Sequence, residues 1–237
     1  MKFFDYDGPL FRFLNKMADL MWLNILALIC CIPIFTIGAS FTALHYVALK
    51  IVRDEEGYIT RGFFKSFREN FFQSTVIWGI FLVVFAVLGM DYYLIIRQGL
   101  EVSNVHRSLI MVIGVLALFT AVMVFPVQAK FANPIRITIK NSFIVAVLQF
   151  PKTFLMIVLM LVPVGICYFS WRVIPVAFLF GLSVPAVLSA MLYNKSFLRM
   201  EAQFMEANAP QETEGEESES IFSDELDELV TEDTSVR

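Results

Sequence analysis

Residues 73–96 read QSTVIWGIFLVVFAVLGMDYYLII, and Asp91 is the only charged side chain among them. A helix needs about 20 apolar residues to cross the hydrocarbon of a bilayer, and this run is long enough. Backbone groups in lipid must find hydrogen-bond partners within their own segment, which favours a helix. The sequence therefore predicts a membrane-spanning helix at residues 73–96.

The composition of the whole chain extends this prediction. Of the 237 residues, 58% are hydrophobic, 17% are charged, and 25 are Phe. A soluble domain is typically about 45–50% apolar and about 25% charged. Three further apolar runs, at residues 108–127, 153–171 and 174–193, are long enough to span a membrane. We predict an all-α fold, a polytopic integral membrane helical bundle.

The first apolar region, residues 15–53, is too long for one span. As a single helix it would be about 60 Å long, twice the thickness of the hydrocarbon. Its middle reads CIPIFTIG, and Pro33 and Gly38 bracket a plausible turn. We therefore predict two short helices, at residues 15–31 and 36–52.

The distribution of Lys and Arg decides between five and six transmembrane helices. Five spans divide the basic residues of the body eleven to six, whereas six spans place fourteen on one side. The opposite side then keeps only Arg97, Arg107 and Arg172. Because Lys and Arg are retained on the cytoplasmic side, we predict six helices with both termini cytoplasmic, and keep five as the alternative.

Two connections on the cytoplasmic side are predicted to be amphipathic elbow helices. The first, residues 60–71, reads TRGFFKSFRENF. On a helix its Phe residues share one arc and its charges lie opposite. The apolar arc consists of Phe63, Phe64, Phe67 and Phe71. This helix is expected to lie in the membrane interface or to pack its Phe face on the spans. The second elbow lies between residues 130 and 152, and its helix is expected to start at Pro134.

An acidic turn follows the second predicted span. Residues 54–57 read DEEG, and Gly57 is expected to permit the turn. The three acids can pair with neighbouring basic groups or with a partner, or can simply be solvated. The candidate partner or membrane-interface contacts from this turn and the first elbow are Arg53, Asp54, Glu55, Glu56, Arg61, Phe63, Lys65, Phe67 and Arg68.

Polar residues inside the predicted spans are functional candidates by default. These are Asn24, His45 and Asp91. Asp91 lies near the outer end of its helix and fits an interfacial anchor. His45 lies deeper and fits a proton relay or a hydrogen-bonded packing histidine. Lys50, near a cytoplasmic end, is expected to extend its ammonium group to the interface.

The sequence contains no pattern typical of catalysis. It has no nucleotide-binding Gly-rich loop, His/Glu metal motif or nucleophile elbow. Cys30, Cys31 and Cys167 lie in apolar runs without the spacing of metal ligands or of a disulfide framework. We expect a protein that is not an enzyme, needs no cofactor or metal and binds no nucleic acid.

Charge divides the chain into two predicted parts. From Glu206 onward there are twelve acidic residues and one basic residue, a net charge of −11, whereas residues 1–205 have a net charge of +7. The tail is poor in aromatic residues and rich in Glu, Ser and Thr, a composition typical of disorder. We predict a transmembrane domain at residues 1–205 and a disordered, acidic cytoplasmic tail at 206–237.

Several segments together resemble the YesL family of bacterial membrane proteins, a family of unknown function. The segments are Asp7-Gly-Pro-Leu10, Asn15-Lys-Met-Ala-Asp-Leu20, Pro33-Ile-Phe-Thr-Ile-Gly38, Arg53-Asp-Glu-Glu-Gly-Tyr58 and Phe63-Phe-Lys-Ser-Phe-Arg-Glu-Asn-Phe71. The resemblance covers about residues 1–205 and implies a location in the bacterial plasma membrane. Genes of the family often lie beside those of carbohydrate ABC importers, which implies an association with sugar uptake. The resemblance supplies no catalytic or binding residues.

The leading functional expectation is a non-catalytic accessory or interaction partner in ABC-type carbohydrate uptake. Its expected partners are the lipid bilayer and subunits of a sugar ABC transporter, contacted through the cytoplasmic elbows. One alternative is a small solute transporter or channel in its own right, although the spans offer few polar groups for a path. Another is a membrane-anchored signalling component with the acidic tail as its output.

Overall fold

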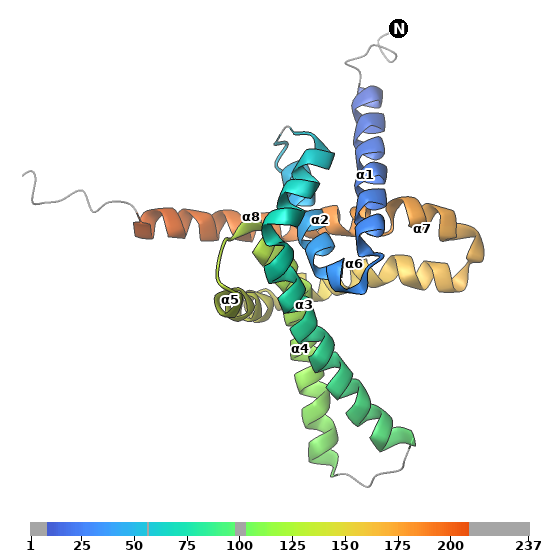
Figure 1. The fold of residues 1–237 in the computed structure, drawn as a ribbon, viewed down its shortest axis with the longest axis vertical. Coiled ribbons are helices and arrows are strands. Elements are labelled where there is room, and N and C mark those ends of the chain that lie inside the picture. Colours follow the sequence, from blue (N-terminus) through green and yellow to red (C-terminus); the bar gives the residue numbers. More distant parts are fainter. Residues whose placement is uncertain (1–8, 56, 98–102, 209–237) are drawn as a thin grey trace, which may run out of the picture. The chain divides into compact units, whose positions relative to one another are not determined.

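The computed structural model of the chain describes residues 9–55, 57–97 and 103–208, and every regular element among them is a helix (Figure 1). In chain order they are α1 (Pro9–Cys31), the 3-10 turn η1 (Ile34–Thr36), α2 (Ile37–Val52), α3 (Ile59–Arg97), α4 (Asn104–Lys130), α5 (Ile135–Leu148), α6 (Phe150–Phe169), the 3-10 turn η2 (Trp171–Val173), α7 (Ile174–Phe180) and α8 (Ser183–Asn208). The predicted all-α fold is confirmed.

Five helical segments within the described residues are long and apolar enough to cross a membrane. They are Phe13–Cys31, Ile34–Val52, Ile59–Ile95, Asn104–Lys130 and Phe150–Phe169. A sixth candidate is the pair Trp171–Phe180 and Ser183–Gln203, whose two helices are bent by 56°. This agrees with the prediction of a polytopic helical bundle with six spans, or five as the alternative.

The chain divides into two compact units, Met1–Asn194 and Lys195–Arg237. The first unit holds α1 to α7 and the beginning of α8, and the described part of the second is the remainder of α8. The sequence analysis placed the domain boundary after residue 205, where the net charge changes sign, whereas the compact units divide after Asn194. Since residues 209–237 lie outside the described part, the disordered acidic tail stays a prediction.

The first apolar region forms two helices, as predicted from its Pro and its length. α1 ends at Cys31, and α2 begins at Ile37 after the short turn η1. The hydroxyl of Thr36 closes this turn by donating to the backbone oxygens of Cys30 at 2.6 Å and Pro33 at 2.7 Å. The bond to Cys30 pairs a carbonyl group that the end of α1 leaves without a helical partner.

Pro33 and Gly38 bracket the turn, as predicted, and Gly38 lies in the first turn of α2. A Cβ atom at this position would lie 2.5 Å from the backbone oxygen of Ser74 and 2.7 Å from Cβ of Trp78. A glycine is therefore needed because α3 passes very close to α2 here. Small residues allow such close approach of helices in membrane proteins.

The first predicted elbow is not a separate element, because α3 runs without interruption from Ile59 to Arg97. The expectation of an elbow helix followed by a span at residues 73–96 is therefore wrong in its boundary. No Pro or Gly occurs between residues 63 and 78, so nothing in the sequence ends the helix there. With 39 residues, α3 is about 58 Å long, nearly twice the thickness of the hydrocarbon.

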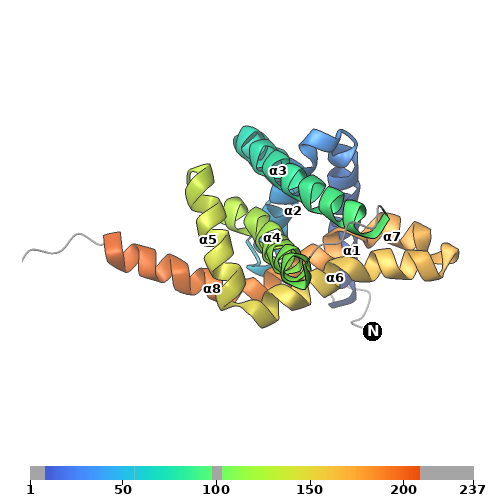
Figure 2. The same ribbon diagram turned by 90° about the horizontal axis from the view of Figure 1, so that it is seen from below.

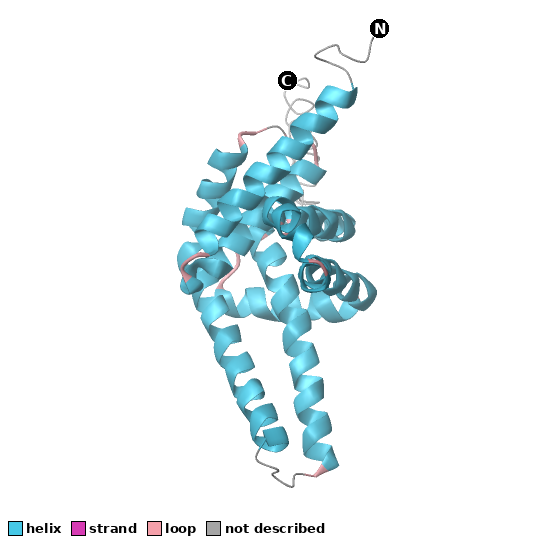
Figure 3. Cartoon of the chain, turned by 90° about the vertical axis from the view of Figure 1, so that its right-hand side faces the viewer, coloured by secondary structure: helices cyan, strands magenta, loops and turns pink. Residues whose placement is uncertain are grey.

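α2 packs antiparallel to the first half of α3 only. The hydroxyls of Thr42 and Ser74 are 2.9 Å apart, and Nε1 of Trp78 donates to the backbone oxygen of Ile34 at 2.9 Å. The α1–α2 turn thus lies beside Trp78. From Trp78, α3 rises about 28 Å further to Arg97. Figures 1 and 3 show the ends of α3 and α4 extending beyond the α1–α2 turn.

α3 and α4 form a hairpin with its own apolar cluster. Ile77, Phe81, Val124 and Phe125 are buried together between the two helices. At the base of the hairpin, Nε2 of Gln73 donates to the backbone oxygen of Asn133 at 2.6 Å. The second elbow forms as predicted: α5 starts directly after Pro134 and crosses α4 (Figure 2).

The last predicted span, at residues 174–193, is broken. α7 ends at Phe180, and α8 begins at Ser183. Pro185 has no backbone N–H, and it is tolerated because it lies in the first turn of the new helix. α8 then continues to Asn208, beyond the predicted end of the span.

Candidate functional site

The start of α1, the end of α2 and the start of α3 meet. Nζ of Lys16 lies 3.0 Å from Oδ1 of Asp54, and both side chains are largely exposed. Nε1 of Trp22 donates to the hydroxyl of Thr60 at 2.8 Å. These contacts join helices that are distant in sequence and bring several predicted contact residues into one region. The ion pair itself contributes little to stability because water screens it.

The loop from α2 to α3 turns at Asp54 and not at Gly57. Asp54 has a φ of 50°, in the left-handed region, and is the only non-glycine residue with a positive φ in the described chain. Asp tolerates this conformation better than most residues. The prediction that Gly57 permits the turn is therefore wrong. The side chain of Arg53 points toward α8, since its Nε donates to Oδ1 of Asn194 at 2.9 Å.

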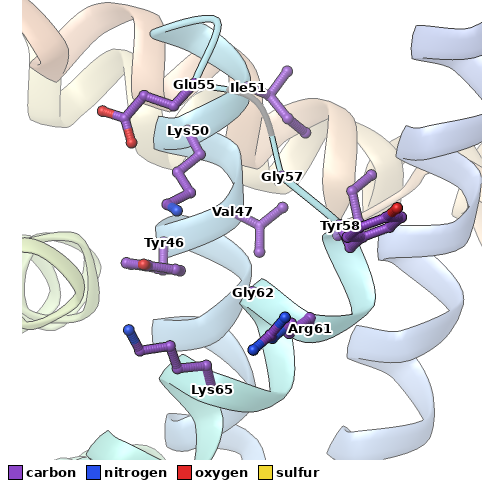
Figure 4. Close-up of a pocket in the computed structure, with 11 residues that line it drawn as sticks. Tyr46, Val47, Lys50, Ile51, Glu55, Gly57, Tyr58, Arg61, Gly62 and Lys65 are labelled. Atoms are coloured by element: carbon purple, nitrogen blue, oxygen red, sulfur yellow. The ribbon is translucent and has the colours of Figure 1, made fainter.

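A cavity of about 310 Å³ lies between the end of α2 and the start of α3 (Figure 4). It is lined by Tyr46, Val47, Lys50, Ile51, Glu55, Gly57, Tyr58, Ile59, Arg61, Gly62 and Lys65. The loop between the helices is short, so the last turn of α2 and the first turns of α3 face the same space. We call this space the α2–α3 cavity.

Three cationic side chains converge on the α2–α3 cavity. Lys50 comes from α2, and Arg61 and Lys65 come from α3. Figure 4 shows the ammonium groups of Lys50 and Lys65 on either side of the Tyr46 ring. Nζ of Lys50 lies 5.2 Å from the centre of that ring, a cation–π distance. The only carboxylate among the lining residues is that of Glu55.

These cations are not neutralised by ion pairs within the described part of the chain. Lys50, Arg61 and Lys65 form no ion pair there, and the ion pair in this region joins Lys16 to Asp54. The lining also includes Ile59, the first residue of α3. A helix N-terminus carries partial positive charge and free backbone N–H groups. The cavity therefore offers positive charge and hydrogen-bond donors, which suits an anion.

Comparison with known proteins gives one finding. Residues 20–92 match a family described as "Protein of unknown function, DUF624". No curated protein and no solved structure matches the chain. The DUF624 segment, residues 20–92, runs from the middle of α1 through most of α3 and contains every residue that lines the α2–α3 cavity. Since the match carries no further name, the resemblance to YesL stays a prediction.

The sequence predicted only part of the cavity in this DUF624 segment. Of the predicted contacts, Glu55, Arg61 and Lys65 line it, whereas Arg53 and Arg68 do not. Glu56 lies outside the described residues. Sequence reasoning missed Tyr46 and treated Lys50 as a simple membrane anchor. The spacing could have indicated that these residues act together. Tyr46 and Lys50 lie one helical turn apart, and so do Arg61 and Lys65.

The Phe residues at the start of α3 are only partly buried. Phe63 is completely buried, whereas Phe64 is 41% exposed and Phe67 is half-buried. Phe63 and Phe67 stack with their ring centres 6.2 Å apart, and Phe67 lies 5.5 Å from Phe71. The sequence placed Phe63 and Phe67 on one apolar arc without indicating which of them is buried. Phe63 is the buried residue of this arc, next to Gly62, where an added Cβ would be in ordinary contact with Val47 of α2 at 3.8 Å.

Asn24 has a structural role at the break between α7 and α8. It is completely buried in α1. Its Nδ2 donates to the backbone oxygen of Phe178 at 2.7 Å, and its Oδ1 accepts from the backbone N–H groups of Leu182 at 2.7 Å and Ser183 at 2.9 Å. One side chain thus satisfies backbone groups on both sides of the break, as an apolar environment requires.

His45 and Asp91 are the other two intramembrane candidates. His45 is buried in α2, and its Nδ1 lies 3.3 Å from the hydroxyl of Tyr193. Its Nε2 has no hydrogen-bond partner among the described residues. A single long hydrogen bond favours the packing interpretation over a proton relay. Asp91 is half-buried near the end of α3, far along the helix from the α2–α3 cavity.

No cluster of three or more His, Cys, Asp or Glu side chains able to hold a metal is found within residues 9–55, 57–97 and 103–208. Cys30, Cys31 and Cys167 are free thiols and partly buried. The α2–α3 cavity is lined by three cationic side chains, an arrangement that suits an anion.

Proposed function

We propose that this protein is a non-catalytic multi-pass membrane protein that assists ABC-type carbohydrate uptake by contacting a transporter subunit on its cytoplasmic side. The proposed contact is the basic face of α3, formed by Arg61, Lys65 and Arg68. The supporting observation is that all three side chains are exposed although the same helix turn buries Phe63 completely.

The spacing of these residues supports a docking face. Positions 61, 65 and 68 follow one another at four and three residues, so their side chains emerge on one side of α3. Exposed charges contribute little to folding stability, which leaves them available for a partner. A basic face attracts an acidic surface and steers its approach before contact.

The test is affinity purification from the native membrane, comparing the wild-type protein with a variant in which Arg61, Lys65 and Arg68 are all Gln. Since these residues also contribute to the positive-inside bias, the topology of the variant is verified first. We expect a carbohydrate permease or ATPase subunit to copurify with the wild type and to be depleted with the variant. If the correctly inserted variant retains every wild-type partner, the basic face is not the docking surface.

The broken pair α7–α8 supports a second candidate, a small solute transporter. Interrupted helices form the substrate sites of many transporters because they expose backbone groups inside the membrane. Here Asn24 already bonds the groups on both sides of the break, which leaves less for a solute. Sugar flux into liposomes that contain only this protein would favour this candidate over the accessory role.

A further inference from the structure

We propose that the α2–α3 cavity is a binding site for a phosphate group, held by Lys50, Arg61 and Lys65. This inference does not rest on the proposed role in carbohydrate uptake, although Arg61 and Lys65 also belong to the proposed docking face. It concerns a small ligand held between two helices, whereas the docking face is an open surface on α3.

The first argument is the arrangement of charge. Three cations from two different helices line one space of about 310 Å³, and Glu55 is the only acidic residue among the lining side chains. Like charges that converge in this way repel one another unless an anion lies between them. Within the described residues, no carboxylate forms an ion pair with any of the three.

The second argument is the supply of donors with suitable geometry. Arg61 presents a planar fork of N–H groups, which matches two oxygens of a phosphate. Lys50 and Lys65 add point charges from opposite sides of the Tyr46 ring (Figure 4). The start of α3 at Ile59 adds the positive end of a helix, which favours anions in the same space.

The third argument is space. The lining includes Gly57, where an added Cβ would meet no atom within 4 Å, so the wall of the cavity is open at the loop. A phosphate and the first atoms of its substituent fit within about 300 Å³, at the lower end of small-molecule sites. The cavity is too polar for an apolar ligand, since its three ammonium or guanidinium groups would lose water without compensation.

A phosphate in this position has two sources, the headgroup of an anionic phospholipid or a soluble phosphate compound. The chemistry recognised is the same, so the experiment contains one arm for each. The full-length protein in a neutral detergent is titrated in one arm with inorganic phosphate against chloride at equal ionic strength. The other arm compares dihexanoyl phosphatidylglycerol with dihexanoyl phosphatidylcholine. The midpoint of thermal unfolding is measured at each concentration, because a ligand that binds the folded state raises it.

Three single variants identify the site. Lys50→Gln and Lys65→Gln each remove one cavity cation, and Arg68→Gln removes an exposed cation of α3 that does not line the cavity. We expect saturable stabilisation of the wild type, a loss of about tenfold in apparent affinity for each cavity variant, and no change for Arg68→Gln. Arg68→Gln also separates the two proposals, since that residue belongs to the docking face.

Saturation by phosphatidylglycerol alone identifies the ligand as a lipid headgroup, and saturation by inorganic phosphate identifies a soluble anion. The proposal is overturned if neither arm saturates, if phosphatidylcholine acts as strongly as phosphatidylglycerol, or if both Lys50→Gln and Lys65→Gln bind like the wild type.

Discussion

The side-chain amide of Asn24 donates a hydrogen bond of 2.7 Å to the backbone oxygen of Phe178, although the two residues are far apart in the chain. The same side chain accepts from the first N–H groups beyond the break between α7 and α8. α1 therefore holds the broken helix pair together. Asn24 was a functional candidate in the sequence because it is polar and lies within a predicted span. Its hydrogen bonds to backbone groups give it a structural role.

Asn24→Leu should destabilise the protein, because leucine has a similar volume but no hydrogen-bonding groups. Each buried backbone group left without a partner costs about 1–3 kcal/mol. We expect a lower midpoint of thermal unfolding in detergent. Asn15→Leu, the same change at an exposed position of α1, is the matched control and should be close to wild type. Equal midpoints for the two variants would contradict the role of Asn24.

Phe63→Ala should cost far more stability than Phe64→Ala, although the two residues are adjacent. Phe63 is fully buried and Phe64 is 41% exposed. Truncating a buried Phe typically costs about 3–5 kcal/mol, since it leaves a cavity. The amount of monodisperse protein after extraction and the unfolding midpoint measure the difference. If Phe64→Ala were the more damaging change, the start of α3 would pack differently from the structure described.

Gly38→Ala should disrupt the contact between α2 and α3. The new methyl group would meet the backbone oxygen of Ser74 at 2.5 Å, and a backbone atom in a long helix cannot move aside cheaply. The control is Gly79→Ala in α3, where an added Cβ meets no atom within 4 Å. Because alanine is the better helix former, that variant should be neutral or slightly stabilised. A Gly38→Ala protein as stable as Gly79→Ala would argue against the close approach.

The depth of the α1–α2 turn can be measured by labelling. The sequence predicts that this turn reaches the outer surface. The turn lies beside Trp78, however, about 28 Å before the end of α3, and that distance nearly equals the hydrocarbon thickness. Ile32, Ile34 and Phe35 at its tip are strongly exposed apolar residues, which suits lipid rather than water. We therefore expect the turn to end within the bilayer, so that α1 and α2, although long and apolar enough to be spans, form a re-entrant pair.

In a background without the native cysteines, Asn104→Cys should react with an impermeant thiol reagent applied from outside, and Phe35→Cys should not. Phe35 is the better probe than Thr36, because Thr36 is buried and bonded to Cys30 and Pro33. Strong labelling of Phe35→Cys in intact cells would show that α1 and α2 both cross the membrane.

Removal of residues 209–237 should leave the membrane part folded. The prediction rests on the composition of this segment, which is acidic and has few apolar residues. Truncation after Asn208, the last residue of α8, preserves every described helix. Expression and the unfolding midpoint should match those of the full chain. A marked loss of folded protein would indicate that the tail docks on the basic body.

Local sequence signals determined much of this fold. Long apolar runs required helices, Pro33 separated α1 from α2, and Pro134 marked the start of α5. These features depend only on backbone chemistry and on the preference of each segment for lipid. They could therefore be predicted without knowing how the helices pack.

Tertiary structure decided what the remaining signals mean. Whether residues 60–71 form a separate elbow, and which Phe is buried, depend on where α2 lies against α3. The α2–α3 cavity exists only because a turn at Asp54 brings Lys50 next to Arg61 and Lys65. The role of Asn24 depends on a helix break more than 150 residues later in the chain. Such contacts join segments distant in sequence, and their free energy comes from packing and desolvation between partners that no local pattern identifies.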